Sequence, residues 1–278
     1  MITTMRGWLE GNPILAWTVW FQVALGVLAL LAMPFDKRLI LGINPWVKPL
    51  KFDLSIAIFL MTMAAILSGL QGFERSRGWI GGGVGIVLSI ENFLISMQAF
   101  RGVRSHMNFS TPFDARLFAI MGIMAVVSTA LIAWTLGGVL IDRTQWPSAV
   151  AWGVRLGLLA FLAGSVEGIL IVSHGGHTVG AADGLRGLPL LDWSRKHGDL
   201  RIAHFFALHA LQAFPLLGLL LSRTSMPPWL QIALTCVGAA TYLGADWLLF
   251  RQAMAGRPLF PRCNVLESRS RKEWYEAQ

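Results

Sequence analysis

Charged side chains are scarce in this sequence. Asp, Glu, Lys and Arg make up 14% of the 278 residues, while apolar residues make up 55%. Soluble domains usually carry about 25% charged residues, and a water-soluble chain of this length would need more charge on its surface. The mean hydropathy of +0.58 agrees. The composition therefore excludes an ordinary soluble protein and predicts that a lipid bilayer surrounds the chain.

Cysteine is also scarce, with only two residues in the whole chain. Cys236 falls inside an apolar stretch, and Cys263 falls near the C-terminus. They cannot form a CxxC pair, and two such distant cysteines imply no disulfide framework. Internal repeats and low-complexity segments are absent as well. We therefore expect a single transmembrane domain over residues 1–278.

Seven apolar stretches approach the length of about 20 residues that a helix needs to cross about 30 Å of hydrocarbon. Helices are required because a membrane span must satisfy its own backbone hydrogen bonds. The sequence therefore predicts an all-α fold, a polytopic membrane protein with a bundle of about seven transmembrane helices. The expected spans are residues 14–33, 52–70, 79–99, 117–141, 149–172, 202–221 and 229–250.

Basic residues give the chain a formal net charge of +8, and most of them lie on one side of the predicted bundle. They gather in the connections 34–51, 100–116 and 173–201 and in a tail, residues 251–278. By the positive-inside rule this side is cytoplasmic, as in a bacterial-type inner membrane, with the N-terminus outside. No basic stretch is long enough for a nucleic acid platform, so we expect no nucleic acid partner.

Four carboxyl groups fall within or at the edge of the predicted spans: Asp53, Glu91, Glu167 and Asp246. Ionisable residues in a membrane are costly and usually face the bundle interior or a water-filled cavity. At a rise of about 1.5 Å per residue, all four lie in or near the cytoplasmic half. We take Glu167, Glu91 and Asp246 as candidate catalytic residues, and Asp53 lies at the cytoplasmic mouth of the second span.

All six histidines belong to the same predicted side. His174 follows Glu167 by seven residues, so the two side chains share one helix face. His177 adds a third group if the helix persists through the two intervening glycines. Imidazole nitrogen and carboxylate oxygen are common ligands of transition metals. The pattern predicts His174, His177 and His204 as metal ligands.

The remaining histidines allow a second kind of site. His204 and His209 lie five residues apart in the first turns of the sixth span, and His106 follows the third span. We take these three as cofactor-binding candidates, since one haem could use an axial histidine from each of two helices. The cofactor therefore stays open between a transition metal and a haem.

The connection 173–201 is long and rich in glycine. Long ordered loops are often functional, and Leu190, Leu191 and Trp193 predict that this one packs against the bundle. Gly164 and Gly168 have the small-xxx-small spacing of closely packed membrane helices. Glu167, which lies between them, is therefore expected to face other helices.

Three functions fit these features, and the sequence does not decide whether the protein is an enzyme. The leading hypothesis is a cytoplasm-facing His/carboxylate site that binds a metal or haem and acts on a lipid-like or quinone-like substrate, which could enter from the bilayer. The first alternative is a proton-coupled transporter that uses the buried carboxyl groups. The second is a structural or assembly subunit.

Overall fold

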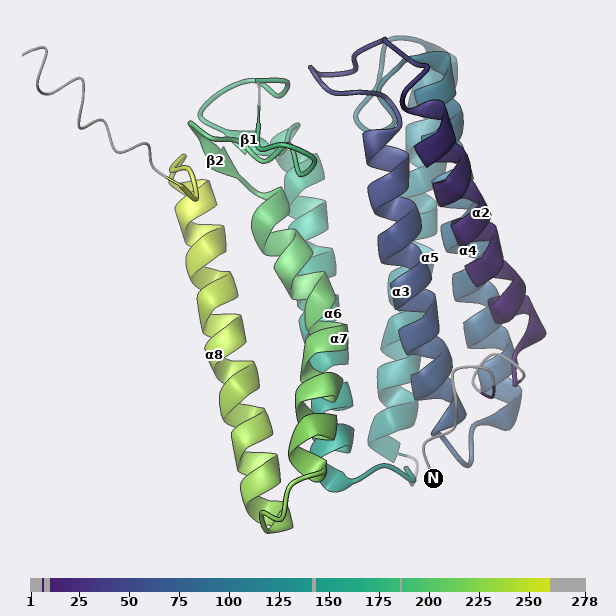
Figure 1. Cartoon of the computed structure of the whole chain (residues 1–278), viewed down its shortest axis with the longest axis vertical. Helices are drawn as coiled ribbons and strands as arrows, with labels where there is room; N and C mark the ends of the chain where they lie inside the picture. Colours follow the sequence, from purple (N-terminus) through teal and green to yellow (C-terminus); the bar gives the residue numbers. More distant parts are fainter. Residues whose placement is uncertain (1–6, 8–10, 142–143, 186, 261–278) are drawn as a thin grey trace, which may run out of the picture.

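The computed structural model describes residues 7, 11–141, 144–185 and 187–260. This part of the chain forms a helical bundle with one short two-stranded ribbon (Figure 1). The helices are α2 (Pro13–Ala32), α3 (Val47–Ser68), α4 (Glu74–Arg101), α5 (Pro112–Ile141), α6 (Ser148–His174), α7 (Arg201–Ser222) and α8 (Pro228–Met254). All seven are long and apolar enough to cross a membrane. The predicted all-α, polytopic fold is confirmed, and the protein is an integral membrane protein.

Every predicted span falls on an observed helix, but the helices extend further than hydropathy indicates. α3, α4 and α5 each begin five residues before the predicted span. Hydropathy detects the hydrocarbon-facing stretch, whereas a helix continues into the headgroup region with polar residues. α8 likewise continues to Met254, so the predicted tail begins later than residue 251. Residues 261–278 of that tail, with Cys263, lie outside the described residues.

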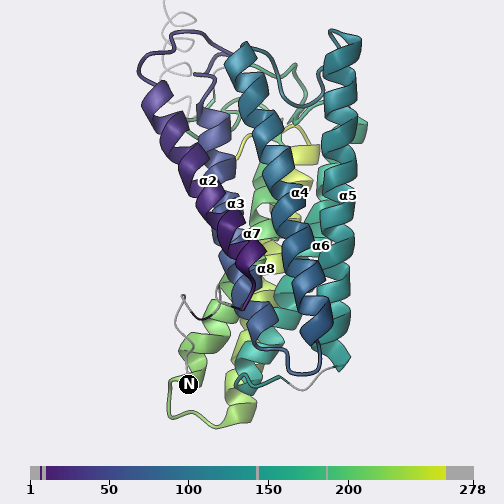
Figure 2. The ribbon, with the colours of Figure 1, turned by 90° about the vertical axis from the view of Figure 1, so that its right-hand side faces the viewer.

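The longer connections lie together at one end of the bundle (Figures 1 and 2). We call this the long-loop end, and it comprises residues 33–46, 102–111 and 175–200 together with the C-terminal end of α8. The third of these connections contains the ribbon of β1 (Thr178–Val179) and β2 (Gly198–Asp199), which pair antiparallel. The predicted cytoplasmic side corresponds to this end.

The helices form two groups, α2–α5 and α6–α8 (Figure 1). Within the second group, α6 packs closely along α7, and α8 contacts both. One apolar core joins the groups, because Leu60 and Met63 of α3 belong to the same buried cluster as Leu158 of α6 and Leu211 of α7. The two groups are therefore parts of one bundle.

Candidate functional site

His106 lies at the centre of a polar cluster at the long-loop end. Its Nδ1 atom is 3.2 Å from Nζ of Lys48 and 3.1 Å from the hydroxyl of Ser105. Its Nε2 atom is 3.8 Å from a carboxyl oxygen of Glu91. Lys48 comes from the first turn of α3 and Glu91 from α4, while His106 lies in the connection to α5. Three separate segments thus bring a lysine, an imidazole and a carboxyl group together.

The position of Lys48 fixes the form of the imidazole. A protonated Lys48 can only donate a hydrogen bond, so while Lys48 is charged Nδ1 of His106 accepts and the ring proton lies on Nε2, on the side of Glu91. Burial, together with the positive charge of Lys48, lowers the pKa of His106 below its usual value, although Glu91 opposes the shift. The side chain is still 27% exposed. A neutral imidazole with access to solvent is suited to accept and release protons.

Aromatic rings enclose this cluster. The ring centroids of Phe52 and Phe118 lie 6.1 and 6.0 Å from that of His106. The Lys48 ammonium lies 5.6 Å from the centroid of Phe52, within the range of a cation–π contact. These rings cover the sides of the imidazole that they face, and the low dielectric there strengthens its electrostatic coupling to Lys48 and Glu91.

Asp183 joins two connections at the same end. Its carboxylate is 3.1 Å from Nδ1 of His177 and 3.8 Å from Nη2 of Arg104, and it accepts a 3.0 Å hydrogen bond from the backbone N–H of Thr178. Burial, and then the charge of Arg201, lower the pKa of His177. This junction fastens the α6–α7 connection to the α4–α5 connection, and its carboxylate opposes the lowering of the His177 pKa.

A line of polar contacts runs down the boundary between α3 and α7. Ser55 lies 3.4 Å from Nε2 of His209, and Gln212 donates to the hydroxyl of Thr62 at 3.3 Å. Above them, Lys51 donates to the backbone carbonyl of Leu191 at 3.1 Å. Membrane helices are often held together by such bonds, and these three connect the two helix groups.

The closest approach of α6 and α7 surrounds His204. Its Nδ1 atom lies 2.8 Å from the carbonyl oxygen of Gly164. A Cβ atom at Gly164 would lie 2.8 Å from that of Ala207, and one at Gly168 would lie 2.9 Å from Cε1 of His204. The tight packing expected of Gly164 and Gly168 is therefore present.

Glu167 lies on α6 and Asp246 on α8, two helices of this group that contact each other, and the two carboxyl groups interact electrostatically. Oε2 of Glu167 and Oδ1 of Asp246 are buried, and no described residue forms a hydrogen bond with either oxygen. Among the described residues, no hydrogen bond or ion pair links either carboxyl group to a histidine. The two side chains therefore form a carboxyl pair that is separate from the His106 cluster.

The expected helical ligand set of Glu167, His174 and His177 is not formed. α6 ends at His174 because Gly175 adopts a left-handed conformation with φ of 78°, so His177 lies beyond the helix. His174 is exposed, and its Nδ1 faces the carbonyl oxygen of Gly176 at 3.0 Å. Over the part of the chain that the structure describes, no three His, Cys, Asp or Glu side chains could share a metal ion.

The other candidates occupy different surroundings. His106 and Glu91 are brought together, whereas His204 and His209 point to different neighbours on α6 and α3. Of the three residues expected to pack on the bundle, Trp193 does so, with its ring centroid 5.9 Å from that of Phe205 on α7, whereas Leu190 and Leu191 are 73% and 38% exposed. Leu190 has a positive φ of 63°, so the backbone turns there.

Sequence reasoning overlooked two partners. Lys48 counted only as a basic residue near a span, and its neighbour His106 is 58 positions away. Asn92, inside α4, gave no signal because a neutral amide in a span suggests no charge. The one hint for Lys48 was its position before the second span, where a helix extended by one turn brings it to the membrane boundary.

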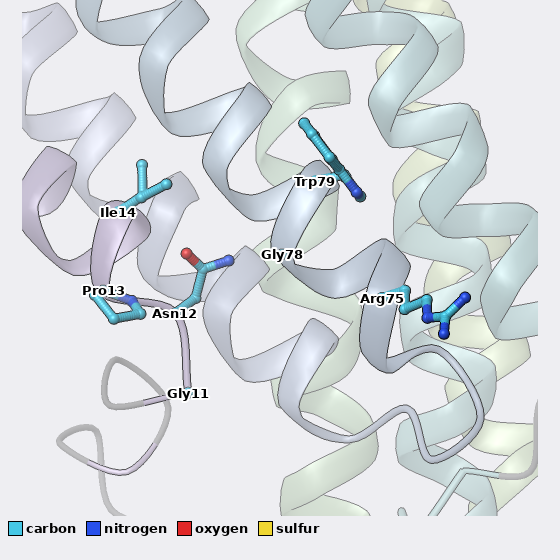
Figure 3. Close-up of a pocket in the computed structure, with 7 residues that line it drawn as sticks. All are labelled: Gly11, Asn12, Pro13, Ile14, Arg75, Gly78 and Trp79. Carbon is cyan, nitrogen blue, oxygen red and sulfur yellow. The ribbon is translucent and has the colours of Figure 1, made fainter.

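A cavity of about 450 Å³ lies at the opposite end of the bundle, between the starts of α2 and α4 (Figure 3). Asn12, Arg75 and Trp79 are among the residues that line it. Asn12 has a structural role, since its side chain accepts from the N–H of Leu15 and donates to the carbonyl of Arg77, both at 3.1 Å. This cavity is remote from the histidines.

Comparisons with known proteins do not assign a function, which must therefore be argued from this geometry. No protein-family model matches the chain, and neither a curated protein nor a solved structure shows significant similarity to it.

Proposed function

We propose that the protein is a proton-coupled membrane transporter and that His106 exchanges protons at its cytoplasmic side. The observation that supports this proposal is the position of one imidazole between the ammonium of Lys48 and the carboxyl group of Glu91. Chains of His and carboxyl groups carry protons in membrane pumps and transporters. The orientation rests on the concentration of Lys and Arg at the long-loop end.

The geometry suggests an order for the proton steps. Lys48 gives a proton to Nδ1 of His106, and the ring gives its Nε2 proton to Glu91. The first separation of 3.2 Å is already a hydrogen bond, whereas the second, at 3.8 Å, is longer than one. The ring must therefore approach Glu91, or a water must bridge them, before the transfer. Lys48 then recovers a proton from the cytoplasmic side, and the ring returns to its first tautomer by releasing the Nδ1 proton to water and taking a proton from water on Nε2.

The carboxyl groups of Glu167 and Asp246 are the proposed internal proton acceptors in α6–α8. Each has a buried oxygen without a partner, which a bound proton would relieve. Among the described residues, the polar side-chain contacts from α3 to the second helix group are those of Ser55 and Gln212 with α7 and that of Lys51 with the connection before α7. Each is worth about 1 kcal/mol, so these hydrogen bonds would not by themselves prevent a small movement of the helix groups that preserves their shared apolar core. A lipid-like or quinone-like substrate would enter from the bilayer.

The metal- or haem-dependent alternative has less support. It required several histidines and a carboxyl group at one point, and the described residues contain no such group of three. A purely structural subunit would give no role to the unpaired carboxyl oxygens of Glu167 and Asp246. The proton-coupled transporter accounts for both the His106 cluster and the buried acids.

Proton uptake by proteoliposomes tests the proposal. The vesicles contain a pH indicator, and valinomycin with potassium clamps the membrane potential while the outside is acidified. Uptake is measured in vesicles of purified phospholipid, in vesicles that contain a bacterial membrane lipid extract, and with a soluble cell extract outside. We expect faster uptake than in protein-free vesicles in at least one of these conditions.

Two variants at the same end of the bundle make the test specific. His106→Asn should reduce the protein-dependent uptake at least tenfold, because an amide cannot accept and release a proton in this way. His174→Asn is the matched control and should keep the wild-type rate, since His174 is exposed and apart from the cluster. Uptake equal to that of protein-free vesicles in all three conditions, or equal rates for both variants, would contradict the proposal.

A further inference from the structure

A buried chain of polar side chains crosses three helices of the α2–α5 group. Gln22 of α2 donates to the hydroxyl of Ser89 at 3.1 Å and accepts from the amide of Asn92 at 2.6 Å. The same amide nitrogen of Asn92 donates to Oδ1 of Asp53 on α3 at 2.5 Å. Gln22 and Asn92 are fully buried, and Asp53 is 2% exposed. None of these contacts involves the His106 cluster.

Two neighbouring oxygens assign the orientation of the Asn92 amide, whereas the hydroxyl of Ser89 can donate or accept. The nitrogen of Asn92 has two hydrogens and two oxygen acceptors, one on Gln22 and one on Asp53. With the amide reversed, its oxygen would instead face two oxygens, which would repel one another. Asn92 therefore donates both of its hydrogens, and its oxygen must find a donor elsewhere.

Two oxygens in this row of hydrogen-bonded side chains lack a hydrogen-bond donor. Oδ2 of Asp53 and Oδ1 of Asn92 are both buried and have no hydrogen-bond partner among the residues that the structure describes. Among the described residues, the carboxyl group of Asp53 forms no ion pair, and its side-chain hydrogen bond comes from the neutral amide of Asn92. An ionised carboxylate without a cationic partner is among the most costly groups to bury. A proton bound to Oδ2 would remove the charge of Asp53 and provide a hydrogen-bond donor for the oxygen of Asn92.

The space beside Asp53 favours a proton over a metal cation. α2 passes close to this side chain at Gly26, where an added Cβ atom would lie 3.3 Å from Cβ and 3.8 Å from Oδ2 of Asp53. Hard cations take six or more oxygen ligands, whereas only two unpaired oxygens belong to this chain of residues. A proton needs no further ligands and no added volume.

We infer that Asp53 and Asn92 form a buried proton-binding site, in which Asp53 holds a proton on Oδ2 and donates it to the oxygen of Asn92. The acid and the amide then share two hydrogen bonds, one in each direction. This site is distinct from the proposed relay through His106, and it does not depend on transport activity. It gives the α2–α5 group a bound proton of its own.

Infrared spectroscopy of the full-length protein in lipid nanodiscs tests this inference. A protonated carboxyl group has a carbonyl stretching band that a carboxylate lacks. We expect the spectrum at pH 7 to contain such a band that disappears in Asp53→Asn. Because Glu167 and Asp246 also lie in the membrane, the band is assigned by the difference between wild type and Asp53→Asn. Asn92→Leu removes the donor to Oδ1 and should move the band to higher wavenumber.

Thermal unfolding supplies the second measurement. Asparagine at position 53 has the shape of a protonated aspartic acid and can donate to Asn92, so Asp53→Asn should keep the wild-type melting temperature within a few degrees. Asp53→Ala should lower it. No loss of a protonated-carboxyl band in a folded Asp53→Asn variant would overturn the inference. A second result would also overturn it: a higher melting temperature of the wild type in sodium chloride than in choline chloride, with no such difference in Asp53→Asn. This result would show that the site binds a cation.

Discussion

Nδ1 of His204 lies 2.8 Å from the carbonyl oxygen of Gly164, which brings an imidazole on α7 against the backbone of α6. Because a carbonyl can only accept, this nitrogen carries the ring proton. The contact is possible only because α6 has glycine at 164 and 168, where side chains would otherwise separate the helices. His204 is therefore bound to the helix interface, and its structural role can be tested apart from any chemistry.

The first prediction concerns this interface. Gly168→Ala places a Cβ atom 2.9 Å from Cε1 of His204, so the imidazole or the helices must shift. Overpacking of this kind costs about 1–3 kcal/mol. We expect a lower melting temperature for the purified protein, measured by the fluorescence of its tryptophans.

Gly122→Ala on α5 is the matched control, because a Cβ atom there meets nothing within 4 Å. Alanine is favoured over glycine in a helix by about 0.5–1 kcal/mol, so this variant should be as stable as the wild type or more stable. An equal loss of stability in both variants would show that the close approach at Gly168 is not its cause.

The second prediction concerns the carboxyl pair of α6 and α8. Glu167→Gln and Asp246→Asn remove an ionisable group whose buried oxygen has no partner. Each variant should therefore unfold at the wild-type temperature or above it, while its proton uptake in vesicles decreases severalfold. A strongly destabilised Glu167→Gln would instead indicate that an ionised Glu167 has a partner that stabilises the fold.

The third prediction is a pH dependence from His177. Burial and the charge of Arg201 lower the pKa of His177 in the folded protein, while an unfolded histidine titrates near about 6.5. As the pH falls below that value, the unfolded chain gains a proton that folded His177 does not accept. The free energy of unfolding should therefore be fully retained above about pH 6.5 and decrease as the pH falls toward the lowered pKa.

Melting temperatures measured between about pH 7.5 and about pH 5 test this effect. These limits lie about one unit or more on either side of the unfolded histidine pKa of about 6.5. His177→Asn should have a shallower decrease than the wild type, because the group that titrates is removed. His174→Asn, on the exposed end of α6, should keep the wild-type slope. A steeper decrease in His177→Asn would mean that protonation of His177 stabilises the fold through Asp183.

The sequence was sufficient to predict the helices, because a bilayer imposes their length and apolar composition. The sequence also predicted that Glu91 and His106 lie toward the same end of the bundle. Nε2 of His106 and a carboxyl oxygen of Glu91 are 3.8 Å apart. The predicted set around His174 and His177 failed because it assumed that the helix continued. Two glycines follow His174, and the first takes the left-handed conformation that ends α6.

Contacts between distant segments could not be predicted in the same way. Asp53 pairs with Asn92, 39 positions away, because α3 and α4 have one particular rotation about their axes. Hydropathy does not define that rotation, since every helix here is apolar on several faces. The same applies to Gln22, which reaches Asn92 from α2. Such polar pairs emerge only once the helices are placed in space.

The last prediction concerns the His106 relay as a unit. If Lys48, His106 and Glu91 pass one proton in sequence, loss of any member interrupts the same step. Lys48→Met and Glu91→Gln should each reduce the protein-dependent proton uptake about as much as His106→Asn does. The double variant Glu91→Gln/His106→Asn should be no slower than either single variant, because groups that act together are strongly non-additive. Rates that fall multiplicatively in the double variant would show that Glu91 and His106 act on separate proton steps.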